Sequence, residues 1–328
     1  MTQISLVTGA TGFLGSAVAR ALLAQGEQVR VLARPNGDRR NLAGLPVEVA
    51  EGSLEDQESL RRAVQGCDSL FHVAADYRLW VRDKQSMLRA NVDGSVALMK
   101  AAQEAGVRRI VYTSSVAVLG HAEGPADENT GSTLADMVGI YKQSKFLAEE
   151  AVKKLVREEG LPVVIVNPST PIGPRDVKPT PTGRIIVEAA QGKIPAYVET
   201  GLNVVHVDDV AAGHLLAREH GKVGERYILG GDDMRLADIL RHVVGRTGRS
   251  TRLVRLPRKP LFPLAVAAET IARFTGKEPM ITVDGLKMAR WHMFFSSAKA
   301  ERDLHYRHRP ATMALDDALA WFRAEGYC

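Results

Sequence analysis

The chain has 328 residues, of which 45% are hydrophobic and 25% are charged, and its formal net charge is +5. This length is enough to bury a full hydrophobic core in one large or two modest domains, and the composition is that of an ordinary globular protein. Two cysteines, Cys67 and Cys328, exclude a disulfide framework and favour a reducing, cytoplasmic location. We expect no secretory signal, because the first residues lack a basic and an apolar region.

The positive charge favours phosphorylated substrates or a negative membrane surface, although a solvated basic surface explains it equally well. Nucleic-acid binding would depend on net charge alone, so we expect none. The longest apolar run, Leu261–Ala268, is too short to span a bilayer, which takes about 20 residues. It predicts a packed or interfacial helix, and with the charge it suggests a loose association with a membrane surface.

A glycine-rich turn follows the first predicted strand, Ile4–Thr8, and opens a helix whose apolar residues recur on one face. Glycine permits the tight turn and the close approach of backbone to a pyrophosphate at the helix N-terminus. The spacing GxxGxxG is weak evidence alone, but strand, glycines and helix together predict a dinucleotide site. The candidate cofactor-binding residues of this turn are Gly9, Thr11, Gly12, Phe13, Leu14 and Gly15.

The end of the second predicted strand, Gln28–Ala33, indicates which cofactor binds. An acidic residue there would bond the adenosine ribose of NAD(H), whereas arginine accommodates the 2′-phosphate of NADP(H). The strand is followed by Arg34, and Asp38, Arg39 and Arg40 lie close behind. The sequence therefore favours NADP(H). NAD(H) stays open, with Asp38 reaching the ribose and the arginines as ordinary loop charges.

Further strands are predicted at Val47–Ala50, Leu70–Ala74, Arg109–Tyr112 and Pro162–Asn167. After the fourth strand, the small residues Ala74 and Ala75 would let backbone approach the ribose next to the nicotinamide. His72 lies inside that strand, so we expect a core residue and not a catalyst. Asn91, in the next helix, is expected to tie neighbouring backbone together. The segment Asp76–Trp80 is either a substrate-contacting loop or ordinary loop packing.

Tyr141 and Lys145 begin the longest predicted helix, roughly Tyr141–Glu159. Residues four apart share one face, so the ammonium and the phenol lie together. A nearby cation lowers the pKa of a phenol, and a phenol so tuned exchanges protons with a substrate oxygen. Ser115, just past the fifth strand, is the hydroxyl that we place beside Tyr141. A tyrosine and a lysine at this spacing are also common on exposed helices, so the assignment depends on its companions.

The second half of the chain is less regular. Arg175, Lys178 and Arg184 could meet a substrate phosphate or simply be exposed. A strand is predicted at Asn203–Val207, after which Asp208 or Asp209 is expected to cap a helix, a reading favoured over an acid–base pair. Further helices are predicted at Leu236–Val244, Leu261–Phe274 and Thr312–Arg323.

With these motifs in order, the chain resembles the extended short-chain dehydrogenase/reductase family, and more closely its hopanoid-associated sugar epimerase and dihydroflavonol 4-reductase-like group. The stretches that carry the likeness are Gly9–Gly15, His72–Trp80, Val111–Ser115, Tyr141–Lys145, Asn167–Pro174, Lys178–Arg184 and Gly201–Val210. The resemblance implies an α/β fold: a Rossmann doubly wound parallel sheet with a smaller, mostly helical C-terminal substrate domain. It implies a dinucleotide-binding domain at 1–167, with a return of roughly 203–229 to the sheet, and a substrate domain at 168–202 and 230–328.

The resemblance also implies roles for single residues. Tyr141 is the general acid/base, Ser115 polarises the substrate oxygen, and Lys145 holds the nicotinamide ribose and lowers the pKa of Tyr141. Many relatives bond the adenine through an aspartate where this chain has Ser53, so backbone or Leu54 would serve here. Other implied cofactor contacts are Thr113, Pro168 and Thr170, and implied substrate contacts are Asp76, Tyr77, Ser114, Lys178, Arg184 and Asn203.

Three functions follow, in order of preference. The first is an NADP(H)-dependent oxidoreductase that acts on a carbonyl or alcohol carbon of a small molecule. The second is a nucleotide-sugar epimerase or dehydratase that keeps NAD bound. The third is a non-catalytic nucleotide-binding protein. The resemblance further implies a homodimer formed by the helix that bears Tyr141 and its neighbour, and no metal site is expected.

Overall fold

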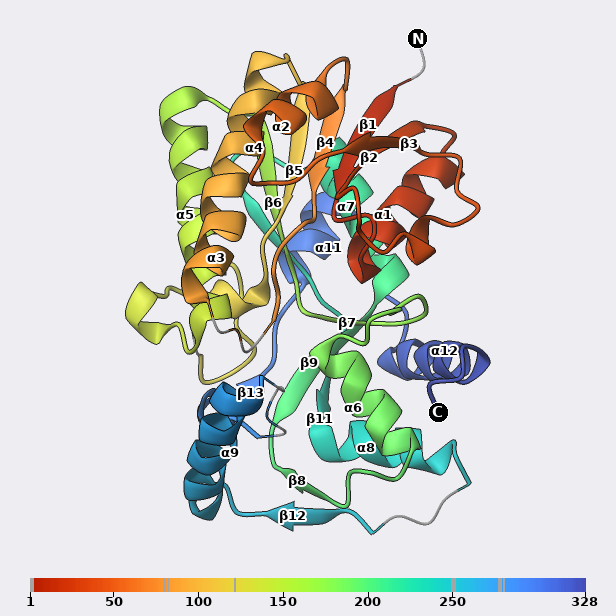
Figure 1. The fold of residues 1–328 in the computed structure, drawn as a ribbon, viewed down its shortest axis with the longest axis vertical. Coiled ribbons are helices and arrows are strands. Elements are labelled where there is room, and N and C mark those ends of the chain that lie inside the picture. Colours follow the sequence, from red (N-terminus) through yellow and green to blue (C-terminus); the bar gives the residue numbers. More distant parts are fainter. Residues whose placement is uncertain are drawn as a thin grey trace.

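The computed structural model describes residues 3–328 except residues 79, 80, 82, 121, 249–251, 277, 278 and 280. Its centre is a seven-stranded sheet in which every neighbouring pair of strands is parallel (Figure 1). From edge to edge the strands are β10 (Arg226–Leu229), β6 (Val163–Pro168), β5 (Arg109–Thr113), β4 (Ser69–His72), β1 (Ile4–Thr8), β2 (Gln28–Ala33) and β3 (Glu48–Glu51). The predicted doubly wound parallel sheet is confirmed.

Helices cover both faces of this sheet (Figure 1). One face carries α1 (Phe13–Ala24), α7 (Val207–His220) and α11 (Ala298–Leu304). The other face carries α2 (Gln57–Val64), α4 (Gly94–Glu104) and α5 (Ile140–Glu159). A short helix, α3 (Lys84–Leu88), joins α4 through a π-helical turn at Arg89–Asp93.

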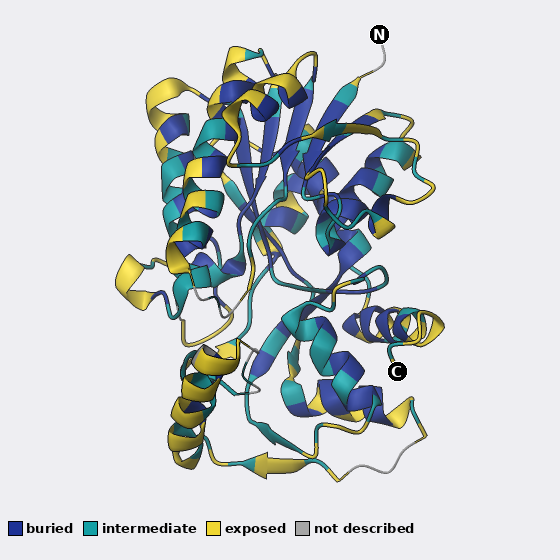
Figure 2. Ribbon diagram, in the orientation of Figure 1, coloured by how far each residue is buried: buried dark blue, intermediate teal, exposed yellow. Residues whose placement is uncertain are grey.

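The central strands are continuous apolar runs because both of their faces are buried. In β6, for example, Val163, Val164, Ile165 and Val166 are all completely buried. Figure 2 shows the sheet as the most buried layer of the molecule, with exposed residues on the outer sides of the helices. This arrangement fixes the carboxyl ends of the strands as one rigid edge.

A smaller part of the chain lies beyond that edge (Figure 1). Its four-stranded sheet contains β7 (Thr170–Ile172), β9 (Gly201–His206), β11 (Asp232–Arg235) and β13 (His292–Met293), and a second pair is formed by β8 (Ala196–Val198) and β12 (Val254–Leu256). Its helices are α6 (Pro181–Ala190), α8 (Leu236–Gly245), α9 (Phe262–Thr275), α10 (Val283–Met288) and α12 (Ala311–Ala324). Helices α6, α8 and α12 share one apolar core.

The predicted return of residues 203–229 to the large sheet is wrong in its first part. Strand β9 pairs with β7, β11 and β13 in the smaller sheet, and only β10 joins the large sheet, beside β6. Helix α7 connects the two sheets directly, because it begins where β9 ends. The three predicted C-terminal helices are present as α8, α9 and α12. Among the described residues, none of the helices is both long and apolar enough to cross a membrane.

Candidate active site

The carboxyl ends of four parallel strands bring the predicted site residues to one edge of the sheet. The glycine turn 9–15 follows β1, residues 74–76 follow β4, Ser115 follows β5 and Pro168 ends β6. Helix α5 begins at the same edge, with Tyr141 in its first turn. Ligands of open α/β sheets bind at this edge.

The fold requires glycine at two of the three glycine positions of this turn, but not at the third. Gly9 has a φ of +74°, and a Cβ there would lie 2.8 Å from the Cα of Ala74. A Cβ on Gly15 would lie 2.2 Å from the carbonyl oxygen of Gly9. At Gly12 a Cβ would meet only that same carbonyl, at 3.2 Å, and its φ of −90° suits any residue. Only Gly12 therefore needs another reason to be glycine.

That reason is consistent with a bound dinucleotide. Gly12 precedes the first turn of α1, and it offers no side chain to cap the free backbone N–H groups. The first turn of α1 also contains no acidic residue. Bare N–H groups at a helix N-terminus, next to a backbone without Cβ, fit a pyrophosphate group. The residues of this turn thus fit the cofactor that the sequence implies.

The Ser115 and Tyr141 side chains lie close together at the edge of the sheet. Burial raises the pKa of the Tyr141 phenol, and a hydrogen bond with the Ser115 side chain acts in the opposite direction. The Ser115 hydroxyl also accepts the N–H of Ala117 at 3.1 Å, which fixes its orientation at the start of a short 3-10 helix, Val116–Val118. The two hydroxyls that a substrate oxygen would need are therefore neighbours.

Lys145 is buried one turn along α5, with only 3% of its surface exposed. Its ammonium donates to the carbonyl oxygen of Thr113 at 2.8 Å and lies 3.5 Å from the Tyr112 hydroxyl. Burial lowers the pKa of Lys145 to about 8, and the carboxylate of Glu149 opposes this shift. The charge of Lys145 is therefore lost just above neutral pH.

The expectation that Lys145 lowers the pKa of Tyr141 is not met in this structure. The pKa of Tyr141 is raised, and the influences on it are burial and the Ser115 side chain. The physical reason is that the Lys145 ammonium turns to the β5 backbone at Thr113 and to Tyr112.

A chain of buried polar groups that sequence reasoning missed continues from Lys145 under the glycine turn. The Tyr112 hydroxyl lies near the Ser95 side chain, whose Oγ lies 2.8 Å from Nε2 of His72. The other ring nitrogen of His72 lies 2.8 Å from the hydroxyl of Thr8, which accepts the N–H of Ala74 at 3.1 Å. Burial lowers the pKa of His72 to about 3, so the ring is neutral. His72 is a core residue, as predicted.

Residues 5–230 match the family model described as the NAD dependent epimerase/dehydratase family. The chain belongs to this family. It is similar to a Synechocystis sp. protein with the provisional name dihydroflavonol 4-reductase, at 43% identity over 333 residues, covering 100% of this chain and 96% of that protein. It is also similar to sterol demethylase protein B of Methylococcus capsulatus, at 35% identity over 326 residues, covering 98% and 99%. Among solved structures, that of gox2253 has 53% identity and a TM-score of 0.90 and covers 99% of each chain.

The resemblance to the extended short-chain dehydrogenase/reductase family is thereby confirmed, and the chain is an enzyme of the NAD dependent epimerase/dehydratase family. The loop after β4 lies at the carboxyl edge of the sheet, where ligands of open α/β sheets bind. Asn91 holds this loop: its side chain bonds the N–H of Asp76 at 2.7 Å and its carbonyl at 2.9 Å, and reaches the Ser144 hydroxyl on α5 at 2.9 Å. The predicted tying role of Asn91 is confirmed. Tyr77 follows with 42% of its surface exposed, whereas Leu79 and Trp80 lie outside the described residues.

The arginines after β2 take different partners. Arg39 pairs with Glu51, and Arg40 pairs with Asp38 at 2.8 Å. Hydrogen bonds from Arg40 hold the pKa of Asp38 well below its usual range. The Arg34 side chain is exposed and makes no side-chain hydrogen bond or ion pair to the described residues. Arg34 is therefore a cation that is available to a ligand after β2.

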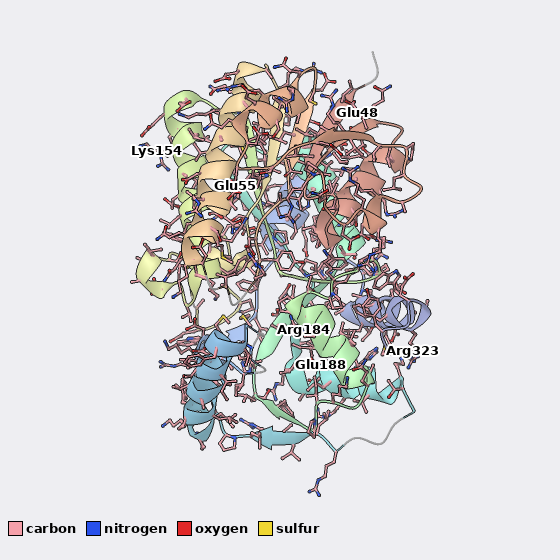
Figure 3. The ribbon with its side chains drawn as sticks, in the orientation of Figure 1. Glu48, Glu55, Lys154, Arg184, Glu188 and Arg323 are labelled. Carbon is pink, nitrogen blue, oxygen red and sulfur yellow. The ribbon has the colours of Figure 1, made fainter. Side chains whose placement is uncertain are left out.

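The three cations beyond β6 do not form one cluster. Arg175 pairs with Asp208, and Lys178 lies 3.6 Å from Asp38 on the cofactor side. Arg184 lies on α6, at the end nearer the large sheet (Figure 3). Of the three, Arg184 lies on a helix of the smaller part of the chain.

Asn203 is not a substrate contact in this structure. Its side chain is 1% exposed and its amide nitrogen bonds the carbonyls of Gly231 and Phe295 and the carboxylate of Asp233, which ties β9 to its neighbours. The physical reason is burial at the centre of the smaller sheet. The predicted cap at Asp208 or Asp209 is also wrong, because His206 caps α7 by accepting the N–H of Asp208 at 3.0 Å.

The carboxylate of Asp209 accepts the backbone and side-chain N–H groups of Arg309. Asp209 therefore anchors the C-terminal segment and does not act in a proton relay. Sequence reasoning also missed Asp176, a carboxyl that is 2% exposed and accepts the N–H and hydroxyl of Thr180 at the start of α6. Burial raises its pKa to about 6. Among the described residues no group of three His, Cys, Asp or Glu could hold a metal ion.

Proposed function

We propose that this protein is an NADP(H)-dependent oxidoreductase that interconverts a carbonyl and an alcohol on a small molecule. The observation that carries the proposal is the contact of Ser115 with Tyr141 beside the buried ammonium of Lys145, at the sheet edge that holds the glycine turn. A carbonyl oxygen needs a hydrogen-bond donor and a proton source while a hydride is exchanged at its carbon.

Each residue has one part in this reaction. The Ser115 hydroxyl orients the substrate oxygen, and the Tyr141 hydroxyl moves the proton to or from it. The Lys145 ammonium binds the ribose next to the nicotinamide. The bound nicotinamide supplies or accepts the hydride. Because burial alone raises the pKa of Tyr141, a positive charge near the phenol is what the site requires for proton exchange near neutral pH.

The preference for NADP(H) is supported by the residues after β2. Arg34 is exposed and available to a 2′-phosphate, whereas the carboxylate of Asp38 is held by Arg40 and approached by Lys178. Arginine with its five donors suits a phosphate group. The family description names NAD, so NAD(H) is the alternative that the test must exclude.

Other parts of the cofactor site remain as proposed from the resemblance. Ser53 and Leu54 follow β3, where the adenine would lie, and the Ser53 hydroxyl accepts the N–H of Glu55 at 3.1 Å. Thr113 presents its carbonyl to Lys145, and Pro168 and Thr170 lie where β6 ends. We further propose a cytoplasmic homodimer that associates through α4 and α5.

The test is Tyr141→Phe, with cofactor binding measured separately. We expect turnover of a carbonyl substrate with NADPH to fall by about a thousandfold, because general acid–base catalysis contributes roughly 10²–10⁴. Affinity for NADPH, measured by fluorescence titration, should change little. Gln143→Ala, two residues along the same helix, is the matched control. Normal turnover in the phenylalanine variant would exclude Tyr141 from proton transfer.

A nucleotide-sugar epimerase or dehydratase is the second candidate, and the family description favours it. Such an enzyme oxidises and re-reduces one substrate, so it would carry tightly bound NAD and consume no NADPH with any ketone. Mass spectrometry of the nucleotide that accompanies the purified protein distinguishes the two. A non-catalytic protein would have no reason to place Lys145, a costly buried charge, next to the Ser115–Tyr141 pair.

A further inference from the structure

Helix α9 exposes large apolar side chains that a soluble helix normally buries. Leu264 is 58% exposed, Val266 54%, Ile271 61% and Phe274 85%. Figure 2 shows α9 as a mostly exposed helix at the periphery of the smaller part of the chain. Scattered apolar residues on a surface need no explanation, but four on a helix of 14 residues form a patch.

Helix α9 exposes the apolar side chains that an ordinary amphipathic helix turns toward the core. Two of its alanines face inward, with Ala265 completely buried and Ala272 2% exposed. Its acidic residue, Glu269, is half-buried and accepts the N–H of Val283 at 2.8 Å, so it is held against α10. In the part of α9 whose side chains are described, the outward face therefore carries no charge.

The sequence segment around α9 accounts for the net positive charge of the protein. Residues 252–292 contain eight Lys and Arg against three Asp and Glu, so this segment alone reaches the +5 of the whole chain. Aromatic residues accompany the cations: the Arg290 guanidinium lies 4.8 Å from the ring centre of Trp291, which is 38% exposed. An apolar helix face with basic and tryptophan flanks is the pattern of a helix that lies in a membrane interface.

The patch is close to the proposed active site. Helix α10 packs against α9, and its Asp284 carboxylate lies within 3.2 Å of where a Cβ on Gly139 would be. Gly139 precedes α5 and stands two residues before Tyr141. A surface bound by α9 would therefore lie beside α5, the helix that carries Tyr141 in its first turn.

We propose that the outward face of α9 docks the protein on an anionic lipid bilayer. The apolar side chains enter the interface, and the basic flanks contact acidic headgroups. A second copy of this chain is the less suitable occupant, because a two-fold contact through α9 would bring two basic flanks together. The proposal does not depend on which reaction the site performs.

The test is sedimentation of the full chain with vesicles of phosphatidylcholine alone and with 30% phosphatidylglycerol, a composition of about one anionic lipid in three. We expect binding only to the anionic vesicles, and loss of that binding at high salt. Ile271→Glu combined with Phe274→Glu should weaken binding by about tenfold or more, because apolar insertion is lost. Met313→Glu on α12, where Met313 is 48% exposed, is the matched control and should bind normally.

Three results would overturn the proposal. The first is no binding to anionic vesicles at low salt. The second is binding that both the α9 variant and the Met313 variant keep in full, which would assign it to net charge. The third is a wild-type dimer that the α9 variant alone dissociates, with no vesicle binding, which would make α9 an interface between copies. Circular dichroism of each variant verifies that it is folded.

Discussion

The edge of the large sheet and helix α9 show opposite patterns of side-chain burial. At the edge, charged and polar groups are buried: Lys145 is 3% exposed and Glu149 2%. On α9, apolar groups are exposed, with Phe274 at 85%. Each arrangement costs stability, since burying a charge and exposing an apolar side chain are both unfavourable. Costs of this kind concentrate at functional sites, which is why we assign catalysis to the edge and docking to α9.

The largest expected effects come from substitutions in the glycine turn at the edge of the large sheet. Gly9→Ala and Gly15→Ala should lower the free energy of unfolding by roughly 2–4 kcal/mol, because each new Cβ overlaps backbone. Gly12→Ala should stay near wild-type stability but bind dinucleotide weakly. Urea unfolding and a fluorescence titration measure the two properties. Equal loss of stability at all three positions would show that the turn serves folding alone.

The variant Lys145→Met tests whether the buried charge of Lys145, which the proposed function needs, lowers the stability of the protein. The pKa of Lys145 is lowered to about 8 in the folded protein, below its unfolded value of 10.5. The unfolded state therefore binds more protons between these pH values, so the wild-type protein gains stability as the pH rises from 8 to 10.5. Below pH 8 the full free-energy cost of burying the charged ammonium is present. We therefore expect the free energy of unfolding of the methionine variant to be up to about 3 kcal/mol higher than that of the wild type. It should be inactive.

Urea unfolding at pH 7 and pH 10 checks this prediction. The stability difference between the variant and the wild type should shrink at the higher pH. A variant less stable than wild type at pH 7 would mean that the bonds from Lys145 to Thr113 and Tyr112 outweigh the burial of its charge.

Arg34→Glu sharpens the assignment of the cofactor. Reversing the charge of this exposed side chain should weaken NADPH binding by about tenfold or more, equivalent to roughly 1.4 kcal/mol, and leave NADH binding nearly unchanged. Titrations with both nucleotides measure the ratio. The matched control is Arg61→Glu, an exposed arginine on α2 that pairs with Glu104 at 3.5 Å. An equal loss for both nucleotides would contradict a 2′-phosphate contact.

The smallest effect is expected on α9. Ile271→Ser and Phe274→Ser should change the free energy of unfolding by no more than about 0.5 kcal/mol, because both side chains are already in solvent. Leu315→Ala on α12, where the side chain is completely buried, should cost roughly 2–5 kcal/mol. Thermal unfolding compares the two. A large loss on α9 would mean that its apolar face is packed in the free protein.

The sequence predicted most strands of the large sheet, because the inner strands are mainly apolar runs bounded by glycine or polar residues. β1 and β2 match their predicted bounds, and α5 differs by one residue. The signal was weaker for β9, which ends in polar residues like a strand of the large sheet but pairs in the smaller one. Which sheet a strand joins depends on contacts far apart in sequence, and those leave no local pattern.

The candidate site was predictable where a residue type has few other uses, as for the glycine turn. Tyr112 and Asp176 were missed because a tyrosine in an apolar strand and an aspartate in a loop have many ordinary roles. Asn203 was misassigned for the same reason: an amide near a strand end can serve a ligand or its own sheet. Burial decided each case, and burial is a property of the folded chain.

The most direct test of the central claim is a crystal structure of the protein with NADPH. We expect the pyrophosphate at Gly12, the 2′-phosphate at Arg34, and the nicotinamide ribose within hydrogen-bonding distance of Tyr141 and Lys145. A dinucleotide bound elsewhere, or a nicotinamide remote from the Ser115–Tyr141 pair, would contradict it.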